Sequence, residues 1–531
     1  MKSLLFVLGP ICVAAGSAHH ALPTATIDSG LVVGTTTLLP SSTATVNKYL
    51  GVPFGAPPVR FRPPEPVAPW STIRNATTWG PACIQQMDED AKSFFDMVKQ
   101  PPPPGGERED CLNLNIFTPA SASTGSKAVL VWIYGGSYVV GTAGVPLYDG
   151  SSFAANQDVV VVTINYRTNV FGFVGDESIP VGERNLGFLD QRLALDWVRR
   201  NIASLGGDPS KVTIMGESAG GSSVDALVLS PPDPLPFRAA IMQSGQSSVK
   251  APIDDPERVA QAWQKLGEFA GCNPDGVLDC LRSFPAMKLK ELAQNASLPF
   301  SPLPDGGVTL TATPRLDRLN STDEVSSIAR VPILVGSNAD EAKPYIIGQN
   351  STKEYLMGLG LGNLTDLILK QYPLGSPGAH TENDRLSLIL TDFGVQCPTK
   401  VLATESAEVG IHTWRYVFNA SFPNNETFKG SGAYHMAEIP LVFGTYLEEN
   451  STEFQRDVSG AMQKAWADFA KDPTRGPGWD EVPTVGIFGD GVKAGMNDEG
   501  KQALTTVDSG DIAKGCDLFQ PIYDGVSTVS G

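Results

Sequence analysis

The chain has 531 residues, of which 41% are hydrophobic, 18% charged and 8% aromatic. This composition is typical of a globular protein and excludes a disordered, collagen-like or coiled-coil chain. With 57 acidic and 39 basic residues the formal net charge is −18. Such a field repels the phosphates of nucleic acids and anionic lipids, so we expect no nucleic-acid partner.

The first residues have the pattern of a secretory signal peptide. Lys2 is followed by an apolar run to about Ala15, and the small residues at 16–18 supply a cleavage site. The run is too short to cross a bilayer, and the C-terminal residues lack the apolar tail of a lipid-anchor signal. We therefore expect residues 1–18 to be a signal peptide and residues 19–531 to be secreted, with no integral membrane segment. A buried N-terminal strand is the alternative.

Cysteines and glycosylation sequons fit the same compartment. Removal of the signal peptide leaves an even number of cysteines, which indicates three disulfides; they are Cys83, Cys111, Cys272, Cys280, Cys397 and Cys516. None of the spacings resembles a paired Cys-x-x-Cys zinc motif, so we expect no metal. Candidate glycosylation sites with the Asn-x-Ser/Thr pattern are Asn75, Asn295, Asn320, Asn350, Asn363, Asn419, Asn425 and Asn450.

Apolar, β-branched runs recur along the chain and have the character of strands buried on both faces. They lie at residues 128–133, 159–164, 212–215, 239–242, 331–335 and 411–418. Between them, Leu189, Leu193 and Trp197 recur at helical spacing. This alternation predicts an α/β fold with a mostly parallel sheet covered by helices on both faces. Because the chain has no internal repeat and no long linker, we expect residues 19–531 to form one domain.

The most informative motif is Gly216-Glu217-Ser218-Ala219-Gly220-Gly221. It follows the apolar run at 212–215 and precedes a helical pattern, which is the context of a nucleophile elbow. Glycines flank the serine because the tight turn leaves no room for larger side chains, and the turn exposes the hydroxyl of Ser218. The motif alone is weak evidence, but its position between a strand and a helix predicts a catalytic serine.

A catalytic serine needs a neighbouring base, and the chain offers few histidines. His19 and His20 lie at the expected new N-terminus, His380 lies in a Pro- and Gly-rich loop, and His412 is predicted to lie within a strand. In α/β-hydrolases the order along the chain is serine, acid, histidine. Elimination therefore favours His435 as the base.

The acid should come from a loop after a strand between the serine and the histidine. The segment Gly336-Ser337-Asn338-Ala339-Asp340-Glu341 follows the run at 331–335 directly. Either carboxylate of this segment has the chemistry to orient the imidazole and to stabilise its protonated form. Spacing alone does not choose between Asp340 and Glu341.

Several stretches resemble the type-B carboxylesterase/lipase family, which includes cholinesterases and secreted fungal lipases. They run nearly from end to end of the chain: Tyr49–Phe54, Glu109–Asn115, Asn185–Gln191 and, most specific of all, Asn201–Gly221. The resemblance is greatest to the secreted fungal carboxylesterases and lipases, and it implies the α/β-hydrolase fold. It also implies that Glu341 is the acid of a triad with Ser218 and His435.

The resemblance further implies three disulfide pairs, Cys83–Cys111, Cys272–Cys280 and Cys397–Cys516. The last closes a loop of about 120 residues, for which the chain-entropy model gives nearly 5 kcal/mol of stabilisation. By position, the backbone N–H groups of Gly136, Ser137 and Ala219 would form the oxyanion hole. Most relatives have glycine or alanine where this chain has Ser137. Its side chain would either narrow the acyl pocket or add a hydrogen-bond donor.

In this family the segment between Cys83 and Cys111 is a mobile flap over the active-site gorge. Here it carries Met87, Phe94, Phe95 and Met97 among acidic residues. These apolar side chains would either present a face to substrate or lipid, or hold the loop against the body. Cholinesterases bind the choline cation on a tryptophan of this flap. Residues 84–110 contain no tryptophan, so we do not expect choline esters to be preferred.

These features predict a secreted serine hydrolase that cleaves carboxylic esters through an acyl-enzyme, with a small-molecule or lipid ester as substrate and no cofactor. One alternative is a triacylglycerol lipase opened at an oil–water interface by the flap. A second is a non-catalytic adhesion domain of the cholinesterase-like kind. Such domains lack the nucleophile, whereas all three triad positions are filled here.

Overall fold

The structure is a computed structural model that describes residues 22–40, 42–249, 255–512 and 514–526. The expected signal peptide lies outside the described residues. A large sheet of eleven strands forms the centre of the molecule, in the order β14-β13-β12-β11-β10-β9-β7-β8-β6-β4-β3. The seven neighbouring strands from β13 to β8 run parallel, and the strands at both ends pair antiparallel. The sheet is therefore mostly parallel, as predicted.

The strands of this sheet are β3 (Thr35–Leu38), β4 (Thr45–Pro53), β6 (Asn113–Pro119), β7 (Lys127–Ile133), β8 (Val160–Ile164), β9 (Gly207–Glu217), β10 (Ala239–Gln243), β11 (Ile333–Asn338), β12 (Thr413–Phe418), β13 (Thr484–Phe488) and β14 (Leu504–Asp508). A second, three-stranded sheet contains β1 (Thr24–Ile27), β2 (Gly30–Val33) and β5 (Arg74–Asn75).

The helices are α1 (Glu89–Met97), α2 (Ser151–Gln157), α3 (Asn169–Gly172), α4 (Leu186–Asn201), α5 (Ala219–Leu229), α6 (Pro256–Phe269), α7 (Val277–Ser283), α8 (Ala286–Asn295), α9 (Pro314–Leu319), α10 (Thr352–Gly358), α11 (Thr365–Gln371), α12 (Glu382–Thr391), α13 (Cys397–Glu408), α14 (Ile439–Phe443), α15 (Glu453–Lys471) and α16 (Cys516–Val526). A π-helical turn, Asp392–Gln396, joins α12 to α13.

The central strands form where the apolar runs predict them, because helices cover both faces and every residue of β8, β10 and β12 is buried. In register, Leu130 of β7 pairs with Val161 of β8 and with Thr213 of β9. The strands β9 and β11 are longer than the runs that predict them. The prediction for His412 is wrong in detail, because β12 begins at Thr413 and His412 precedes it.

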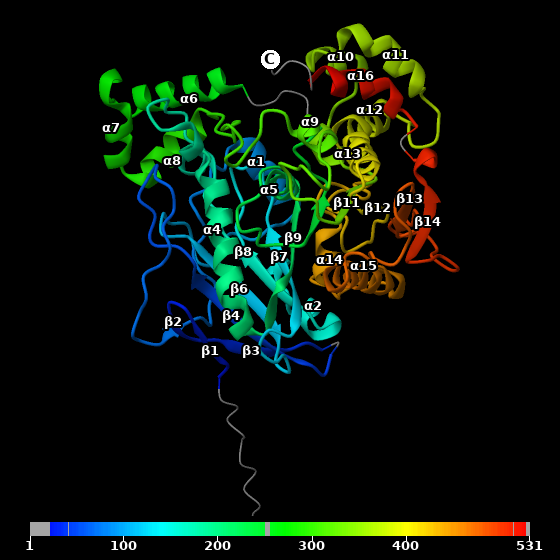
Figure 1. The fold of residues 1–531 in the computed structure, drawn as a ribbon. Coiled ribbons are helices and arrows are strands. Elements are labelled where there is room, and N and C mark those ends of the chain that lie inside the picture. The colour runs from blue at the N-terminus through cyan, green and yellow to red at the C-terminus, as the bar shows by residue number, and fades with distance from the viewer. Residues whose placement is uncertain (1–21, 41, 250–254, 513, 527–531) are drawn as a thin grey trace, which may run out of the picture.

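Two layers of helices enclose the sheet (Figure 1). On one face lie α2, α14 and α15, and there Trp132 of β7 meets Phe443 of α14 edge to face at 5.0 Å between ring centroids. The opposite face is covered by α4, α5 and α13. The large sheet takes strands from Thr35 to Asp508. We propose on this basis that residues 19–531 form one domain.

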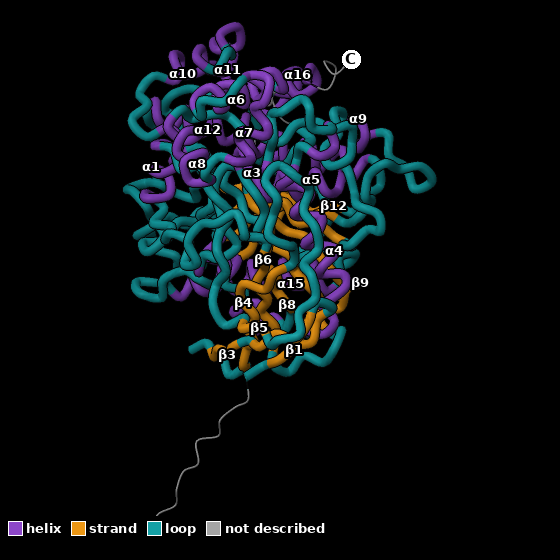
Figure 2. The backbone as a smooth tube through the Cα atoms, turned by 90° about the vertical axis from the view of Figure 1, so that its left-hand side faces the viewer, coloured by secondary structure: helices purple, strands orange, loops and turns teal. Residues whose placement is uncertain are grey.

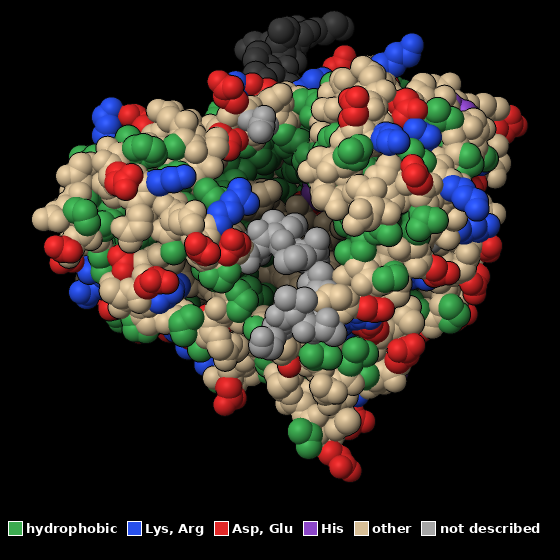
Figure 3. Space-filling model, turned by 90° about the horizontal axis from the view of Figure 1, so that it is seen from above, with side chains coloured by type: hydrophobic (Ala, Val, Ile, Leu, Met, Phe, Trp, Pro, Cys, Tyr) green, Lys and Arg blue, Asp and Glu red, His purple; other side chains and the backbone are tan. Residues whose placement is uncertain are grey.

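Further helices gather beyond one end of the strands (Figure 2). One group contains α6, α7 and α8, and the other contains α10, α11, α12 and α16 (Figure 1). Seen from above, the molecule is hollowed between the two groups (Figure 3). Among the described residues, no helix has both the length and the apolar character needed to cross a membrane.

Three disulfides fasten these outer parts, and they join the cysteines in the pairs that the resemblance implies. The Cys83–Cys111 bond closes the flap that carries α1. The Cys272–Cys280 bond ties the segment after α6 to α7, and the Cys397–Cys516 bond ties α13 to α16. The last bond joins positions 119 residues apart, so it connects a helix of the sheet layer to the C-terminal helix.

Candidate active site

Ser218 lies in a sharp turn between the end of β9 and the start of α5. Its φ of 55° and ψ of −122° are unusual for a residue with a side chain. The turn is tight, because a Cβ atom at Gly216 would lie 2.5 Å from the backbone of Gly220, and one at Gly220 would lie 2.0 Å from the carbonyl oxygen of Ile133. The glycines are therefore required sterically, as a nucleophile elbow predicts.

His435 and Glu341 come from two loops at the same end of the sheet. Glu341 follows β11 and His435 lies between β12 and α14; both side chains are buried. The Nδ1 atom of His435 lies 2.6 Å from Oε2 of Glu341. The other oxygen of Glu341 accepts hydrogen bonds from the Ser244 hydroxyl and the Asn338 N–H, each at 2.6 Å. Glu341 is thus held in one orientation toward the imidazole.

Asp340, the other carboxylate that spacing allowed, points elsewhere. Its Oδ2 atom accepts the Ala433 N–H at 2.9 Å and lies 3.1 Å from Nζ of Lys493. It therefore fastens the loop that leads to His435 without touching the ring. The structure brings Glu341, and not Asp340, to the histidine.

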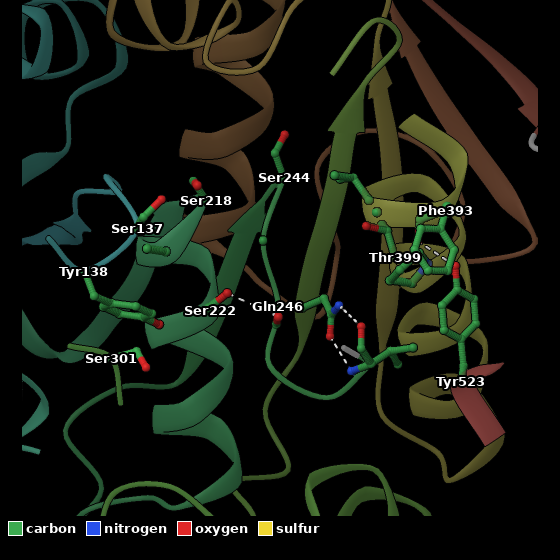
Figure 4. A pocket seen from close by; sticks show the side chains of 16 residues that line it. Ser137, Tyr138, Ser218, Ser222, Ser244, Gln246, Ser301, Phe393, Thr399 and Tyr523 are labelled. Atoms are coloured by element: carbon green, nitrogen blue, oxygen red, sulfur yellow. Dashed lines mark hydrogen bonds between the residues drawn. The ribbon is translucent and has the colours of Figure 1, made fainter. Parts of the chain in front are cut away.

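The loop after β7 has an unusual backbone. Three successive residues have positive φ: Gly136 at 113°, Ser137 at 54° and Tyr138 at 61°. A Cβ atom at Gly136 would lie 2.5 Å from the carbonyl oxygen of Val140, so this position requires glycine. Ser137 lies beside Ser218 (Figure 4). Ala219 begins α5, where backbone N–H groups have no partner within the helix.

Ser137, Ser218 and Ala219 line one cavity of about 390 Å³. Its opposite wall is formed by the π-helical turn Asp392–Gln396, by α13 and by α16 (Figure 4). The Ser218 hydroxyl and the loop with positive φ at Ser137 and Tyr138 thus line a space large enough for an organic ligand, at the end of the sheet from which His435 and Glu341 also come.

Comparison with known proteins shows the family of this chain. The family model described as "Carboxylesterase family" matches residues 21–484. The chain belongs to the carboxylesterase family. It is similar to the cholinesterase of Mus musculus, with 31% identity over 467 residues, covering 82% of this chain and 76% of the relative.

Two further relatives match similar shares of this chain. The acetylcholinesterase of Bungarus fasciatus is 32% identical over 496 residues, covering 87% of this chain and 80% of the relative. The acylcarnitine hydrolase of Mus musculus is 32% identical over 483 residues, covering 85% of this chain and 83% of the relative. The protein is a carboxylic ester hydrolase with an α/β-hydrolase fold.

Two buried glutamates adjoin His435 in this carboxylesterase, and neither was predicted from the sequence. Oε1 of Glu217 lies 3.1 Å from Nε2 of His435, although no described residue forms an aligned hydrogen bond with that oxygen. Glu438 accepts hydrogen bonds from the amides of Gln243 at 3.0 Å and Asn338 at 2.6 Å. The available signal was proximity along the chain, since Glu217 precedes Ser218 and Glu438 lies three residues after His435.

These carboxylates change the proton affinities in the site. Burial, the largest single influence, lowers the pKa of His435, but the charge of Glu217 and the hydrogen bond with Glu341 together raise it to about 9. Burial raises the pKa of Glu217 to about 8, and burial also raises the pKa of Glu438. Protonation of Glu217 removes its attraction for the imidazolium, so Glu217 and His435 titrate as a coupled pair.

The flap of this carboxylesterase reaches the same site. The helix α1 begins after Asp88, whose side chain accepts the Ala91 N–H at 3.0 Å. The ring of Phe94 stacks on that of Tyr345, and the ring centroid of Tyr345 lies 5.8 Å from that of His435. Phe95 meets Phe94 edge to face. These contacts fit the interpretation in which the flap aromatics hold the loop against the body.

The other candidate residues lie away from the cavity. His412 is exposed and pairs with Glu481 at 2.9 Å, and His380 is exposed in a loop. His19 and His20 lie outside the described residues. In the part of the chain that the structure describes, no group of three or more His, Cys, Asp or Glu residues has the arrangement of a metal site.

Proposed function

We propose that Ser218, His435 and Glu341 form the catalytic triad of a secreted esterase, and that the N–H groups of Gly136, Ser137 and Ala219 form its oxyanion hole. The observation that carries the proposal is the 2.6 Å contact between His435 and Glu341 next to the strained turn that exposes Ser218. The contact favours the neutral imidazole tautomer with its proton on Nδ1, so Nε2, which also lies 3.1 Å from Oε1 of Glu217, is the nitrogen that accepts a proton.

The reaction follows from these groups. Nε2 of His435 takes the proton of Ser218 as the hydroxyl oxygen attacks the ester carbonyl carbon, and the carbonyl oxygen becomes an oxyanion. Backbone N–H groups stabilise this charge; losing one such donor typically costs roughly a hundred- to a thousandfold in rate. His435 then protonates the leaving alcohol, and water attacks the acyl-enzyme with His435 again as the base. Glu341 stabilises the imidazolium in both halves of the reaction.

Secretion is the second part of the proposal, and it rests on the signal-peptide pattern, the three disulfides and the sequons. Six of the sequon asparagines are exposed and suited to glycosylation: Asn75, Asn295, Asn320, Asn350, Asn363 and Asn450. Two are half-buried. The amide of Asn425 donates to the Ala437 carbonyl at 2.9 Å, and Lys493 donates to the side-chain oxygen of Asn419 at 3.4 Å. We therefore expect glycans mainly at the six exposed sites.

The residues of the flap are relevant to substrate preference. Residues 84–110 contain no tryptophan, so the cation–π contact on which choline recognition depends is missing from this segment. We propose that simple carboxylic esters are hydrolysed faster than choline esters of the same acyl length. The resemblance to secreted fungal carboxylesterases and lipases stays a prediction.

A triacylglycerol lipase is the second candidate function, and the contact between Phe94 and Tyr345 favours it, because a flap helix packed beside His435 has to move for a large lipid to enter. The test is the rate on a triglyceride as its concentration passes the solubility limit. A lipase shows a jump in rate at that limit, whereas an esterase shows saturation below it.

The triad is tested by Ser218→Ala. The variant should fold normally and lose nearly all esterase activity on p-nitrophenyl esters, because only oxyanion binding remains. Ser210→Ala, at the exposed start of β9, is the matched control and should keep full activity. A Ser218→Ala enzyme that retains a tenth of the wild-type kcat would overturn the assignment.

A further inference from the structure

The cavity beside Ser218 lies on the acyl side of the proposed active site. His435 must stand next to the leaving alcohol, because it gives that alcohol its proton. Among the described residues that line the cavity, neither His435 nor Glu217 occurs, whereas Ser218 and the proposed oxyanion donors Ser137 and Ala219 do. The alcohol therefore leaves on the histidine side, and the acyl group extends into the cavity.

Apart from the hydroxyls of Thr399 and Tyr523, the far wall of this cavity is apolar, and the Tyr523 hydroxyl donates to the Phe393 carbonyl at 2.7 Å. Phe393, Val395 and Pro398 contribute hydrocarbon, and Thr399 in the first turn of α13 lies among them. The side chain of Thr399 faces the cavity (Figure 4). The residue is only 1% exposed, and yet no described residue forms a hydrogen bond with its hydroxyl. A hydroxyl this deeply buried ordinarily has a partner.

Among the buried serine and threonine residues that line the cavity, Thr399 is the one whose hydroxyl has no partner in the described part of the chain. The hydroxyls of Ser137, Ser218 and Ser301 also have no such partner, but these residues are not buried. A helical threonine usually donates to the carbonyl four residues earlier, as Thr365 of α11 does to Leu361 at 3.0 Å. Within the cavity, the Ser244 hydroxyl donates to Glu341 and the Ser222 hydroxyl to the carbonyl of Gln246. The Gln246 amide pairs with the backbone of Val249.

Ser301 provides a second free hydroxyl in the same cavity, on the side of Tyr138 and α5 (Figure 4). It too has no hydrogen-bond partner in the described part of the chain. Besides Ser218 and Ser137 at the proposed reaction centre, two hydroxyls without a partner in the described part of the chain, those of Thr399 and the half-buried Ser301, therefore reach this space. A purely apolar acyl chain would leave both of them without a partner, whereas a chain that carries its own hydroxyl would satisfy at least one.

We propose that this enzyme prefers esters whose acyl chain is a hydrocarbon bearing a hydroxyl group, which Thr399 binds, with Ser301 as a second partner. This inference rests on the proposed function, because it takes the direction of the acyl chain from the roles of Ser218 and His435. The selectivity arises from the cost of leaving a buried polar group unpaired when the acyl chain is purely apolar.

The test compares kcat/KM for matched p-nitrophenyl esters: hexanoyl against ω-hydroxyhexanoyl, and octanoyl against ω-hydroxyoctanoyl. At the chain length that reaches Thr399, the wild-type enzyme should favour the hydroxylated ester roughly three- to tenfold, the size expected for one hydrogen bond. Thr399→Val removes the hydroxyl at nearly constant volume and should bring the ratio close to one. Thr399→Ser should retain the preference, and Ser301→Ala should reduce it.

Thr365→Val is the matched control, because it changes a buried helical threonine that does not line the cavity. Its ratio should equal that of the wild-type enzyme. A wild-type ratio of one at both chain lengths, or a ratio that survives Thr399→Val, would overturn the inference while the esterase assignment stands. Failure of the assignment itself appears separately, as hydrolysis that persists in Ser218→Ala.

Discussion

The ring of Phe94 in the flap helix α1 lies stacked on the ring of Tyr345, with centroids 5.3 Å apart and planes within 8° of each other. Tyr345 in turn contacts the ring of His435. The disulfide Cys83–Cys111 closes the flap that carries this helix and joins positions 28 residues apart. The position of the flap and the surroundings of the proposed base are therefore linked through one aromatic side chain.

Loss of the stack between Phe94 and Tyr345 should alter kcat/KM, because it changes how the flap packs beside His435. Aromatic pairs contribute about 0.5–1.5 kcal/mol beyond their burial, so Phe94→Ala should change kcat/KM for octanoyl esters by roughly two- to tenfold. In a double-mutant cycle, Tyr345→Ala and Phe94→Ala should show strong coupling. Phe95 contacts Phe94 but not Tyr345 among the ring contacts of the described residues, so Phe95→Ala should couple less. Additive effects of Phe94→Ala and Tyr345→Ala would contradict the link.

The pH dependence should respond to Glu217. The proposed base works only as neutral imidazole, so activity rises with pH through the pKa of His435, which the Glu217 charge helps to raise to about 9. Glu217→Gln removes that charge and lowers the histidine pKa. The acid limb of the kcat/KM profile should therefore move to lower pH, by about one unit or more. Glu438→Gln should shift it less, since its influence on His435 is smaller. An acid limb that stays in place or moves upward in Glu217→Gln contradicts this expectation.

Substitutions of the neighbouring acids Glu341 and Asp340 should lower kcat to very different extents. Glu341→Gln removes the carboxylate that holds Nδ1 of His435 at 2.6 Å, and kcat should fall by about 10⁴-fold through loss of the correct tautomer. Asp340→Asn keeps an oxygen for the Ala433 N–H and should cost less than tenfold. Single-turnover rates on p-nitrophenyl acetate measure both. If the order is reversed, Asp340 and not Glu341 is the acid.

Ser137→Gly tests the role of the Ser137 side chain in the loop that forms the proposed oxyanion hole. Because the φ of Ser137 is 54°, glycine adopts the same backbone without strain and the N–H keeps its direction. If the side chain mainly restricts space, short-chain esters should react at similar rates while bulky acyl esters gain roughly tens-fold. Values of kcat/KM for acetyl, octanoyl and branched acyl esters separate the possibilities. A uniform fall across all three would identify the Ser137 hydroxyl as a working donor.

The short-range sequence pattern was sufficient to predict the central strands and the turn at Ser218. Buried parallel strands read as continuous apolar runs, and the run at 239–242 lies within β10 (Ala239–Gln243). The required glycines at Gly216 and Gly220 arise from contacts within the elbow and with the adjacent strand β7, so the motif carries them. The selection of His435 from the sequence also required only counting, since few histidines were available.

Contacts between distant segments were decided by the tertiary structure alone. Asp340 and Glu341 are neighbours in sequence, and only the arrangement of the loops after β11 and β12 turns one carboxylate toward His435 and the other toward Lys493. Stacking of Phe94 on Tyr345 likewise joins positions that no periodicity relates. The free hydroxyl of Thr399 is a third example, because hydrogen-bond partners depend on every segment that packs around a buried group. The sequence by itself determined the strands, the elbow and the family, which depend on local sterics and on burial, whereas the packing of loops and helices decided the charge pairs and the lining of the acyl cavity.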